Sequence, residues 1–362
     1  MAFQAPIRGS FDWGLVAATA ALVILGLLML YSATVSENHE PFRKQLTWAG
    51  IAAVVLVAAV ASPYHFLASA AFPIYLATLA LLGLVLAVGP EIRGAHSWLR
   101  FGPVSFQPAE VAKVATVLLL ATHMSEKQGF GLSLKQAGKM ALIVALPVGL
   151  ILLQPDLGSA LVFFPILGVM VFLAGLRWRV VVVLLLTVVV AVPLLWPHLK
   201  SYQQERVLTF FHPERDPQGA GWQVMQSRIA VGSGGFMGKG IGGGSQGQLN
   251  FLPDRHTDFI FSVLAEETGF AGVVTALFLY GVLLYSCLVT ARTARDRLGA
   301  SISMGVAALI GSQIIINIGV ILGLMPTAGI PLPLMSYGGS SLVSCAAALG
   351  LVLNVRMRCL VN

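Results

Sequence analysis

The chain has 362 residues, of which 57% are hydrophobic and 10% are charged. Soluble domains contain about 25% charged residues, so this composition excludes a water-soluble globular fold as well as a disordered or fibrous chain. The net charge of +7 is no argument for a nucleic-acid partner, because in a membrane protein the location of the basic residues matters more than their sum. Apolar runs of about 20 residues, the length that crosses a bilayer, recur from end to end. The composition therefore predicts a polytopic membrane protein.

The N-terminal segment and the cysteines argue against a cleaved leader and a disulfide framework. The first ten residues are too polar for a signal peptide, and no cleavage-site pattern follows the first apolar run, so we expect a retained first helix. Cys287, Cys345 and Cys359 match neither a metal-ligand spacing nor a disulfide framework. We expect three unpaired thiols.

The apolar runs predict an all-α integral membrane protein with ten transmembrane helices, forming a single polytopic membrane domain over residues 1–362. The fourth and fifth spans are short for a bilayer about 30 Å thick, so we expect them to be tilted or to end inside the protein. No internal repeat of the kind found in many secondary transporters is evident. The expected spans are 13–31, 46–61, 66–88, 108–123, 140–153, 159–176, 180–196, 259–290, 301–324 and 340–355.

Basic residues in the short loops set the expected orientation. An even number of spans places both termini on one side, and that side carries eleven basic residues against four opposite. The positive-inside rule therefore assigns both termini to the cytoplasm. Segment 197–257 then becomes a large extracytoplasmic loop between helices 7 and 8. The eleven are Arg8, Lys127, Lys135, Lys139, Arg177, Arg179, Arg292, Arg295, Arg297, Arg356 and Arg358, and the four are Arg43, Lys44, Arg93 and Arg100.

The extracytoplasmic loop carries a polar stretch that includes Arg206, and nine glycines between Gly232 and Gly247, around Lys239. Loops longer than about 12–15 residues are usually functional or disordered. The aromatic and aliphatic side chains of this loop favour one that folds back on the membrane surface, and a flexible connector is the alternative.

The glycine-rich stretch does not match a nucleotide-binding loop. Gly238-Lys239 is followed by Gly240 in place of Ser or Thr, Ser233 stands where the first glycine should be, and no strand is expected before it. Backbone amides in such a loop can still cradle a phosphate group. Because no ATP pool exists outside the cell, an enzyme here needs an already activated substrate, and a lipid-linked diphosphate sugar is one.

Ionisable residues at membrane depth are functional candidates by default. Glu110 and Lys113 lie three residues apart at the start of the fourth span, on one helical face where they can pair. Asp258 opens the eighth span, Asp156 lies in a turn after the fifth, and the polar run 336–341 precedes the tenth. With the expected topology these groups lie near the outer face. They predict an outward-facing cavity.

Each candidate has a structural alternative. Glu110 and Lys113 can form an ion pair that only stabilises the bundle. Asp258 can be a helix N-terminal residue favoured by capping and the macrodipole, and Asp156 is expected to brace a turn. The prolines Pro331 and Pro333 are typical of a broken-helix entrance.

No protein metal cage is expected. His256 and Asp258 are too close in sequence and have too few neighbouring candidates, and neither a His-Glu-x-x-His motif nor paired cysteines occur. A Mg²⁺ or Mn²⁺ ion bound mainly by substrate phosphates stays open, because such ions need only one or two carboxylates. No covalently bound cofactor is expected.

Four motifs, found in the right order along essentially the whole chain, resemble those of the SEDS family (shape, elongation, division and sporulation). The most specific contains Asp254-Arg255-His256-Thr257-Asp258, in which the arginine before the histidine is more similar to the RodA branch than to the FtsW branch. The four motifs are 98–102 with 105–113, 154–158, 251–261 with 266–270, and 331–333 with 336–341.

The resemblance implies a peptidoglycan glycosyltransferase in the inner (cytoplasmic) membrane. Such proteins polymerise lipid II, the undecaprenyl diphosphate-linked disaccharide peptide, on the outer face of that membrane with a class B penicillin-binding protein that crosslinks the strands. The family's essential aspartate falls on Asp258, which makes it the expected catalytic residue, with Asp156 structural and no metal ligand assigned. The expected substrate-binding residues are Glu110, Lys113, Gln107, Arg206, Lys239, His256, Ser336 and Ser340.

The chemistry of glycan extension is consistent with this assignment. A carboxylate within reach of the acceptor hydroxyl can act as a general base, and the hypothesis gives that role to Asp258. The leaving lipid diphosphate gains negative charge, which Lys113, Arg206, Lys239 or a divalent ion could stabilise. Single displacement predicts inversion at the anomeric carbon, while a two-carboxylate retaining arrangement stays open.

Two other classes of function compete with the enzyme. A flippase for lipid II would use the ion pair and the broken helices, and its Asp258→Ala variant would bind substrate but not move it. A scaffold that positions a crosslinking enzyme would tolerate Asp258→Asn, because a neutral isostere keeps helix capping and loses only the base.

Overall fold

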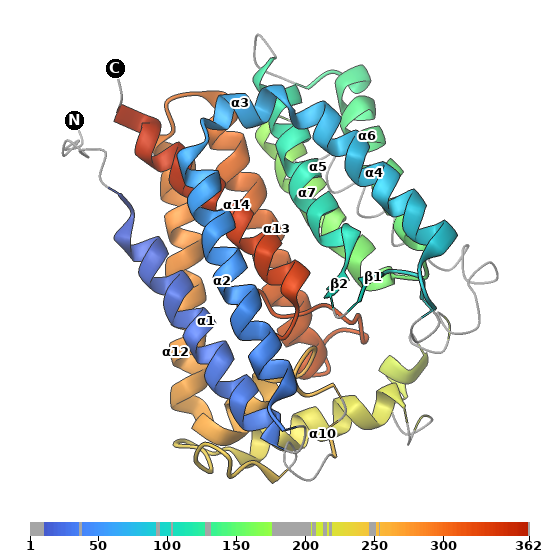
Figure 1. Ribbon diagram of the computed structural model, residues 1–362, viewed down its shortest axis with the longest axis vertical. Helices are drawn as coiled ribbons and strands as arrows, with labels where there is room; N and C mark the ends of the chain where they lie inside the picture. Colours follow the sequence, from blue (N-terminus) through green and yellow to red (C-terminus); the bar gives the residue numbers. More distant parts are fainter. Residues whose placement is uncertain are drawn as a thin grey trace.

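The computed structural model describes residues 11–35, 38–91, 95–102, 104–126, 132–175, 204, 208–212, 216, 219–245, 251–252 and 254–360. Its long helices run side by side between two ends of the molecule (Figure 1). The first helix begins and the last helix ends at the same end, and a helix from the expected outer loop crosses the opposite end. This arrangement agrees with an even number of spans. The membrane face on which the termini lie stays a prediction.

Seven of the described helices are long and apolar enough to cross a membrane. Two further helices complete the described bundle, α5 (Pro108–Ser125) and the shorter apolar α7 (Leu157–Leu173). The seven are α1 (Trp13–Ala33), α2 (Glu40–Ala61), α4 (Ala71–Val88), α6 (Leu134–Leu153), α12 (Ile260–Thr293), α13 (Arg297–Ile321) and α14 (Gly339–Met357). The remaining elements are α3 (Tyr64–Ser69), α10 (Ala220–Ser233), a 3-10 helix (Arg358–Leu360) and the strands β1 (Leu99–Phe101) and β2 (Val104–Phe106).

Nine of the ten expected spans coincide with helices in the described part of the chain. The remaining span, 180–196, lies outside the described residues, so the count of ten stays a prediction. The third span is divided at Ala70 into the short α3 and the long α4. The fifth is longer than expected because Ser133 and Gln136 form a reciprocal capping box that starts α6 at Leu134.

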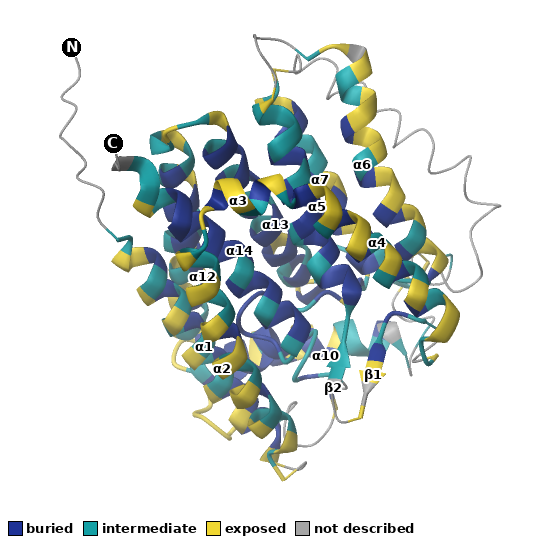
Figure 2. Ribbon diagram, turned by 45° about the horizontal axis from the view of Figure 1, so that its top comes forward, coloured by how far each residue is buried: buried dark blue, intermediate teal, exposed yellow. Residues whose placement is uncertain are grey.

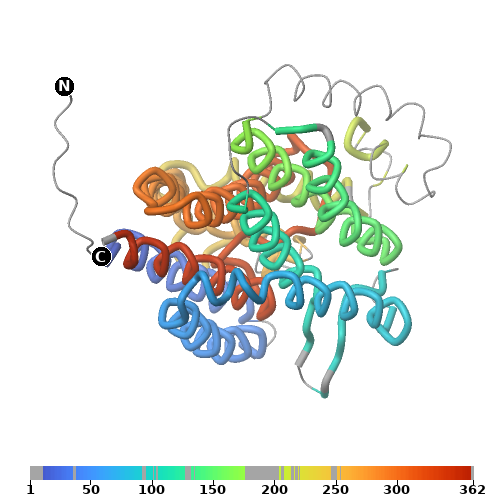
Figure 3. The backbone as a smooth tube through the Cα atoms, turned by 90° about the horizontal axis from the view of Figure 1, so that it is seen from above, coloured from blue at the N-terminus to red at the C-terminus, as the bar shows by residue number. Residues whose placement is uncertain are grey.

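The expectation of an all-α chain misses one element. Strands β1 and β2 form a two-stranded antiparallel hairpin in which Leu99 pairs with Phe106 and Arg100 with Ser105. Gly102 adopts φ 61° in the connecting turn, a conformation that favours glycine. The hairpin extends beyond the helices on the side of α4 and leads directly into α5 (Figure 3). It therefore sets where α5 begins.

Burial separates central helices from peripheral ones. In an 18-residue apolar stretch of each helix, 78% of the residues of α14 and 61% of those of α13 are buried inside the protein, but only 11% of those of α2. Exposed large apolar side chains are concentrated on the outer faces of the bundle (Figure 2), where a bilayer accepts them. Of the polar side chains that the sequence singles out, Glu110 and Lys113 lie on α5, Asp258 lies just before α12, and Ser340 lies at the start of α14.

Candidate active site

Two loops that carry sequence motifs meet at the end of the bundle opposite the termini. The backbone N–H of Tyr337 donates to the carbonyl of His256 at 2.8 Å, and the hydroxyl of Ser336 donates to the carbonyl of Thr257 at 2.5 Å. The rings of His256 and Tyr337 are in edge contact, with centroids 5.7 Å apart. The segment before α12 and the segment before α14 therefore form one hydrogen-bonded unit.

A buried amide on α2 holds the second of these loops. The Nε2 group of Gln45 donates to the carbonyl of Ser336 at 3.1 Å, and its Oε1 atom accepts from the N–H of Gly338 at 3.1 Å. The hydroxyl of Ser336 also accepts from the N–H of Leu332 at 2.8 Å. The sequence analysis did not select Gln45, whose only signal was a polar residue immediately before an apolar span.

Asp258 lies half-buried in the turn before α12, and its backbone is fixed from two sides. Its N–H donates to the carbonyl of Asp254 at 3.2 Å, and its carbonyl accepts from Nδ2 of Asn317 on α13 at 2.9 Å. Asn317 also donates to the carbonyl of Ile330 at 2.8 Å, so one buried amide ties both loops together. The sequence analysis missed Asn317 as well, because an amide inside a long apolar span has no distinguishing local pattern.

Asp258 is not the N-cap residue of α12. That position is held by Phe259, whose side chain makes no capping hydrogen bond. A Cβ atom built on Gly329 would lie 3.8 Å from Oδ2 of Asp258, which places this oxygen beside the backbone of the loop that precedes α14. Asp258 therefore stands one residue before the N-cap of α12, and the alternative in which it only favours the helix macrodipole stays open.

The starts of α5, α7 and α14 are linked around Gln107. Its backbone N–H donates to the hydroxyl of Ser340 at 2.9 Å, and its Nε2 group donates to Oδ2 of Asp156 at 3.1 Å. Asp156 is the N-cap of α7, with Oδ1 accepting from the N–H of Ser159 at 3.0 Å. Asp156 thus has the geometry of a residue that braces a turn, while Gln107 and Ser340 join two motif-bearing helices.

Glu110 and Lys113 form an ion pair on α5, with 2.7 Å between Oε1 and Nζ. Their side chains are 3% and 1% exposed, respectively. In this conformation neither charged group reaches an open surface, so contact with a substrate requires α5 and its neighbours to separate. Removing only one partner of such a buried ion pair leaves the other charge uncompensated and destabilises the protein.

The glycine-rich segment crosses a kink in α12. Gly269 adopts φ 66° and ψ −161°, which interrupts the helix. The carbonyls of Glu266 and Glu267 accept from the N–H groups of Lys239 and Gly240, each at 3.0 Å. On the other side of the kink, the N–H groups of Phe270 and Ala271 donate to the carbonyls of Gly235 and Phe236. The segment thus takes up the four backbone groups that a continuous helix would pair internally.

Side chains reinforce this contact. Nζ of Lys239 lies 2.7 Å from Oε1 of the buried Glu266, and Ser245 hydrogen-bonds to both groups. Oε1 of Glu267 accepts from the hydroxyl of Ser32 on α1 at 2.6 Å, and that hydroxyl accepts from the N–H of Gly242. In the glycine-rich stretch, whose backbone amides were expected to be able to cradle a phosphate, the amides of 239, 240 and 242 therefore donate to protein groups.

Some predictions about the site are outside what the described residues can test. Arg206 lies outside the described residues, so its role stays a prediction. Over the described ranges, no group of three or more His, Cys, Asp or Glu side chains is arranged to hold a metal ion. The involvement of Mg²⁺ or Mn²⁺, and the outward-facing cavity, likewise stay predictions. The structure does bring together His256, Ser336 and the backbone of Asp258, and separately Gln107, Ser340 and Asp156.

The fold and this arrangement define a multi-pass membrane protein with polar motifs gathered at one end of a helical bundle. A family model described as cell cycle protein FtsW/RodA/SpoVE matches residues 13–359. The chain belongs to this family, the SEDS family.

Curated relatives and solved structures agree with that assignment. The peptidoglycan glycosyltransferase MrdB of Escherichia coli K12 is 38% identical over 337 residues, covering 92% of this chain and 90% of that protein. The probable peptidoglycan glycosyltransferase FtsW of Trichlorobacter lovleyi is 36% identical, covering 97% of this chain and 94% of that protein.

Two solved structures are similar over almost the full length. One chain, from a structure of a peptidoglycan synthase complex that coordinates polymerization and crosslinking, has a TM-score of 0.84 and 41% identity, covering 98% of this chain and 99% of that one. The rod shape determining protein RodA of Thermus thermophilus has a TM-score of 0.74 and 36% identity, with the same coverage.

Proposed function

We propose that this protein is a peptidoglycan glycosyltransferase that polymerises lipid II into glycan strands at the outer face of the bacterial inner (cytoplasmic) membrane, with Asp258 as general base. Its curated relatives carry the same enzyme name and match more than nine-tenths of the chain. The observation that carries the residue assignment is the geometry of Asp258. Its backbone is fixed by Asp254 and Asn317, and the residue is half-buried one position before the N-cap of α12.

The reaction needs one proton transfer and one displacement. The acceptor hydroxyl of one sugar attacks the anomeric carbon of the other as its proton passes to the carboxylate of Asp258. The new C–O bond forms while the bond from that carbon to the lipid diphosphate breaks, and the diphosphate leaves with the electron pair. A positioned general base contributes roughly 10²–10⁴-fold to such a step.

Cations near the leaving group would stabilise its growing charge. Lys113 and Lys239 are the candidates in the described residues, and each ammonium group is paired with a glutamate, Glu110 or Glu266. A diphosphate therefore competes with a carboxylate for either lysine. Arg206 and a divalent ion are the other candidates, and their ranking requires measurement.

The partner in this proposal is a class B penicillin-binding protein that crosslinks the strands. The support is the likeness to a chain from a peptidoglycan synthase complex, at 41% identity over 98% of this chain. Membrane lipid surrounds the bundle, since large apolar side chains are exposed on its outer helices.

The decisive experiment is glycan polymerisation from purified lipid II in detergent. Wild type, Asp258→Ala and Asp258→Asn are compared with and without the cognate penicillin-binding protein, whose crosslinking activity is blocked. We expect polymer from wild type and at least about 100-fold less from both variants, with equal thermal unfolding midpoints.

The other outcomes separate the competing functions. Polymer from all three proteins would remove the catalytic role of Asp258 and leave the enzyme class intact. No polymer from any, with the partner present, would favour lipid II transport, which is then measured in vesicles. Normal cell growth with Asp258→Asn and no polymer in vitro would favour a scaffold.

A further inference from the structure

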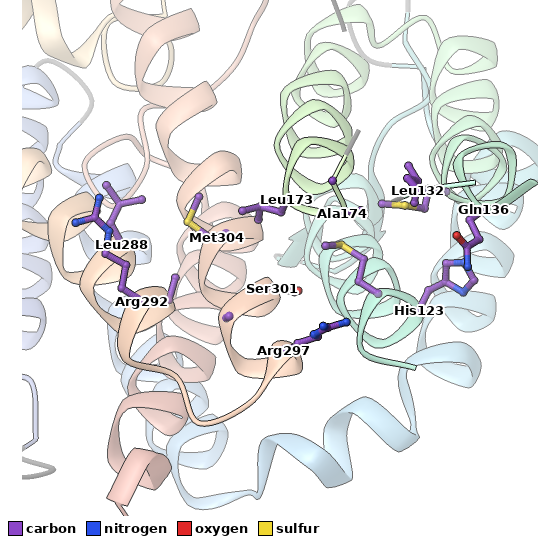
Figure 4. A pocket seen from close by; sticks show the side chains of 15 residues that line it. His123, Leu132, Gln136, Leu173, Ala174, Leu288, Arg292, Arg297, Ser301 and Met304 are labelled. Carbon is purple, nitrogen blue, oxygen red and sulfur yellow. The ribbon is translucent and has the colours of Figure 1, made fainter. Parts of the chain in front are cut away.

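A cavity of about 430 Å³ lies far from the proposed active site, at the end of the bundle where the termini lie. It separates two walls (Figure 4). One wall is the α12–α13 pair, which contributes Leu288, Arg292 and Met304. The other consists of α5, α6 and α7, which contribute His123 and Leu173 among others. Nothing in the glycosyltransferase reaction uses this cavity.

The lining combines apolar walls with a basic edge. Leu288, Met304 and Leu173 provide aliphatic surface, whereas Arg292 and Arg297 provide guanidinium groups. Figure 4 shows Arg297 extending from the start of α13 toward α5. Among the described residues that line it, none is an aspartate or glutamate. The cavity therefore presents a positive charge next to apolar surface, which complements an anionic group attached to a hydrocarbon.

The nearest acidic residue in sequence is engaged elsewhere. Oδ2 of Asp296 accepts from the hydroxyl of Tyr64 at 3.0 Å and lies 2.8 Å from Nε2 of His65. Its Oδ1 atom caps α13 by accepting from the N–H of Gly299 at 2.8 Å. These contacts place the carboxylate of Asp296 against α3 and the start of α13.

Two apolar residues that line the cavity are partly exposed at the surface of the protein. They are Leu173, the last residue of α7, at 40% and Leu288, on α12, at 38%. By the expected topology this end faces the cytoplasmic leaflet, where anionic lipids give a negative surface. Basic pockets between transmembrane helices on this side are a recognised form of lipid head-group site.

We propose that this cavity binds one anionic phospholipid of the cytoplasmic leaflet, with its phosphate against Arg292 and Arg297 and its first acyl carbons against Leu288, Met304 and Leu173. The volume is within the range of about 300–1,000 Å³ that ligand pockets occupy. A bound lipid bridges the two walls and stabilises the protein by mass action. A free phosphate ion would leave the apolar walls unused.

The test measures lipid binding to the full-length protein in detergent by native mass spectrometry, with phosphatidylglycerol and phosphatidylcholine of identical acyl chains. The double variant Arg292→Gln/Arg297→Gln removes both cavity guanidinium groups. Arg295→Gln is the matched control, because Arg295 is exposed in the same connection and does not line the cavity. Met304→Trp fills the apolar wall without changing the charge.

Wild type is expected to bind phosphatidylglycerol at least about tenfold more tightly than phosphatidylcholine, since each lost charged hydrogen bond weakens binding by about that factor. The double variant and Met304→Trp should each lose about tenfold or more, while Arg295→Gln stays within about twofold. Unfolding midpoints in lipid-free detergent confirm that the variants are folded.

Three results would overturn the proposal. Equal weakening by Arg295→Gln would mean general surface electrostatics, and unchanged binding by Met304→Trp would place the lipid outside the cavity. Displacement of the lipid by soluble glycerol 3-phosphate at equal concentration would show a site for a free phosphate compound.

Discussion

At the scale of single residues, buried amides do as much to build the candidate site as charged groups do. Gln45 makes two hydrogen bonds to the backbone of the loop before α14, and Asn317 bonds to the backbone of both loops. Both residues are at most 3% exposed. A buried carbonyl without a donor costs free energy comparable to a lost hydrogen bond. These amides therefore hold the irregular loops, and Asn317 holds Asp258 through its backbone.

Replacing Asn317 with leucine should release both loops. The variant leaves the carbonyls of Asp258 and Ile330 without this donor, which should cost about 2 kcal/mol or more of stability. Polymerisation should fall in parallel, because the turn that carries Asp258 is no longer fixed. Unfolding midpoints in detergent and polymer yield measure the two effects.

The matched control is Gln313→Leu, one turn away on the same helix. Both polar atoms of the Gln313 amide are buried without a hydrogen-bond partner among the described residues. Its replacement should change stability by less than about 1 kcal/mol. Equal losses of stability and polymer yield in the two variants would show that the hydrogen bonds of Asn317 contribute nothing beyond the packing of its side chain.

The ion pair of α5 makes a separate prediction. Lys113→Met alone leaves the buried Glu110 uncompensated and should destabilise the protein by about 3–5 kcal/mol. The double variant Glu110→Gln/Lys113→Met should recover most of that stability. If the pair also binds substrate, polymerisation stays low in the double variant, and recovery of activity together with stability would make the pair purely structural.

At the scale of elements, α12 and the glycine-rich segment depend on each other. The helix kink at Gly269 exposes backbone groups that the segment pairs, and the ion pair of Lys239 with Glu266 lies beside them. Glycines are needed because the backbones nearly touch. A Cβ atom on Gly238 would lie 2.2 Å from the carbonyl oxygen of Glu267, and one on Gly269 would lie 2.3 Å from the nitrogen of Gly238.

Gly238→Ala should separate the segment from the helix, and Gly235→Ala is its control. Both glycines have positive φ, 76° and 57°, so both variants carry a similar backbone strain of about 1–2 kcal/mol. Only the Cβ atom at 238 meets other atoms, whereas nothing lies within 4 Å at 235. A distinctly lower unfolding midpoint for Gly238→Ala alone is expected. Equal midpoints would mean that the close approach has no energetic weight.

At the scale of the whole molecule, the direction of the bundle in the membrane can be tested with thiol chemistry. Three cysteines, Cys287, Cys345 and Cys359, are free, and the first two are buried. The Cys359→Ser variant should therefore show little labelling of its native thiols. In intact cells stripped of their outer layers, Ile241→Cys should react with an impermeant maleimide. Arg295→Cys should react only after permeabilisation, because the expected topology places it in the cytoplasm. The reverse pattern would invert the topology.

Much of the bundle was predictable from the sequence because apolar runs in a membrane protein report directly on helices. The motifs also indicated which loops matter. The contact between segment 235–240 and α12 was not predictable, since it depends on a helix interruption that only tertiary pairing satisfies. Asn317 was missed because an isolated amide in an apolar span has the same local pattern whether or not it binds a distant loop, and Gln45 because polar residues are common just before a span. The hairpin β1–β2 is too short to stand out in a helical chain.

The interrupted α12 also determines how local opening can occur. The amides of Lys239 and Gly240 donate to the helix, and those of Phe270 and Ala271 donate to the segment, so separation of the two elements exposes all four together. Their hydrogen exchange should therefore proceed at a common rate, as one cooperative unit. The turns of α12 around Gly269 would open and close together with a stretch of chain about 30 positions earlier in the sequence.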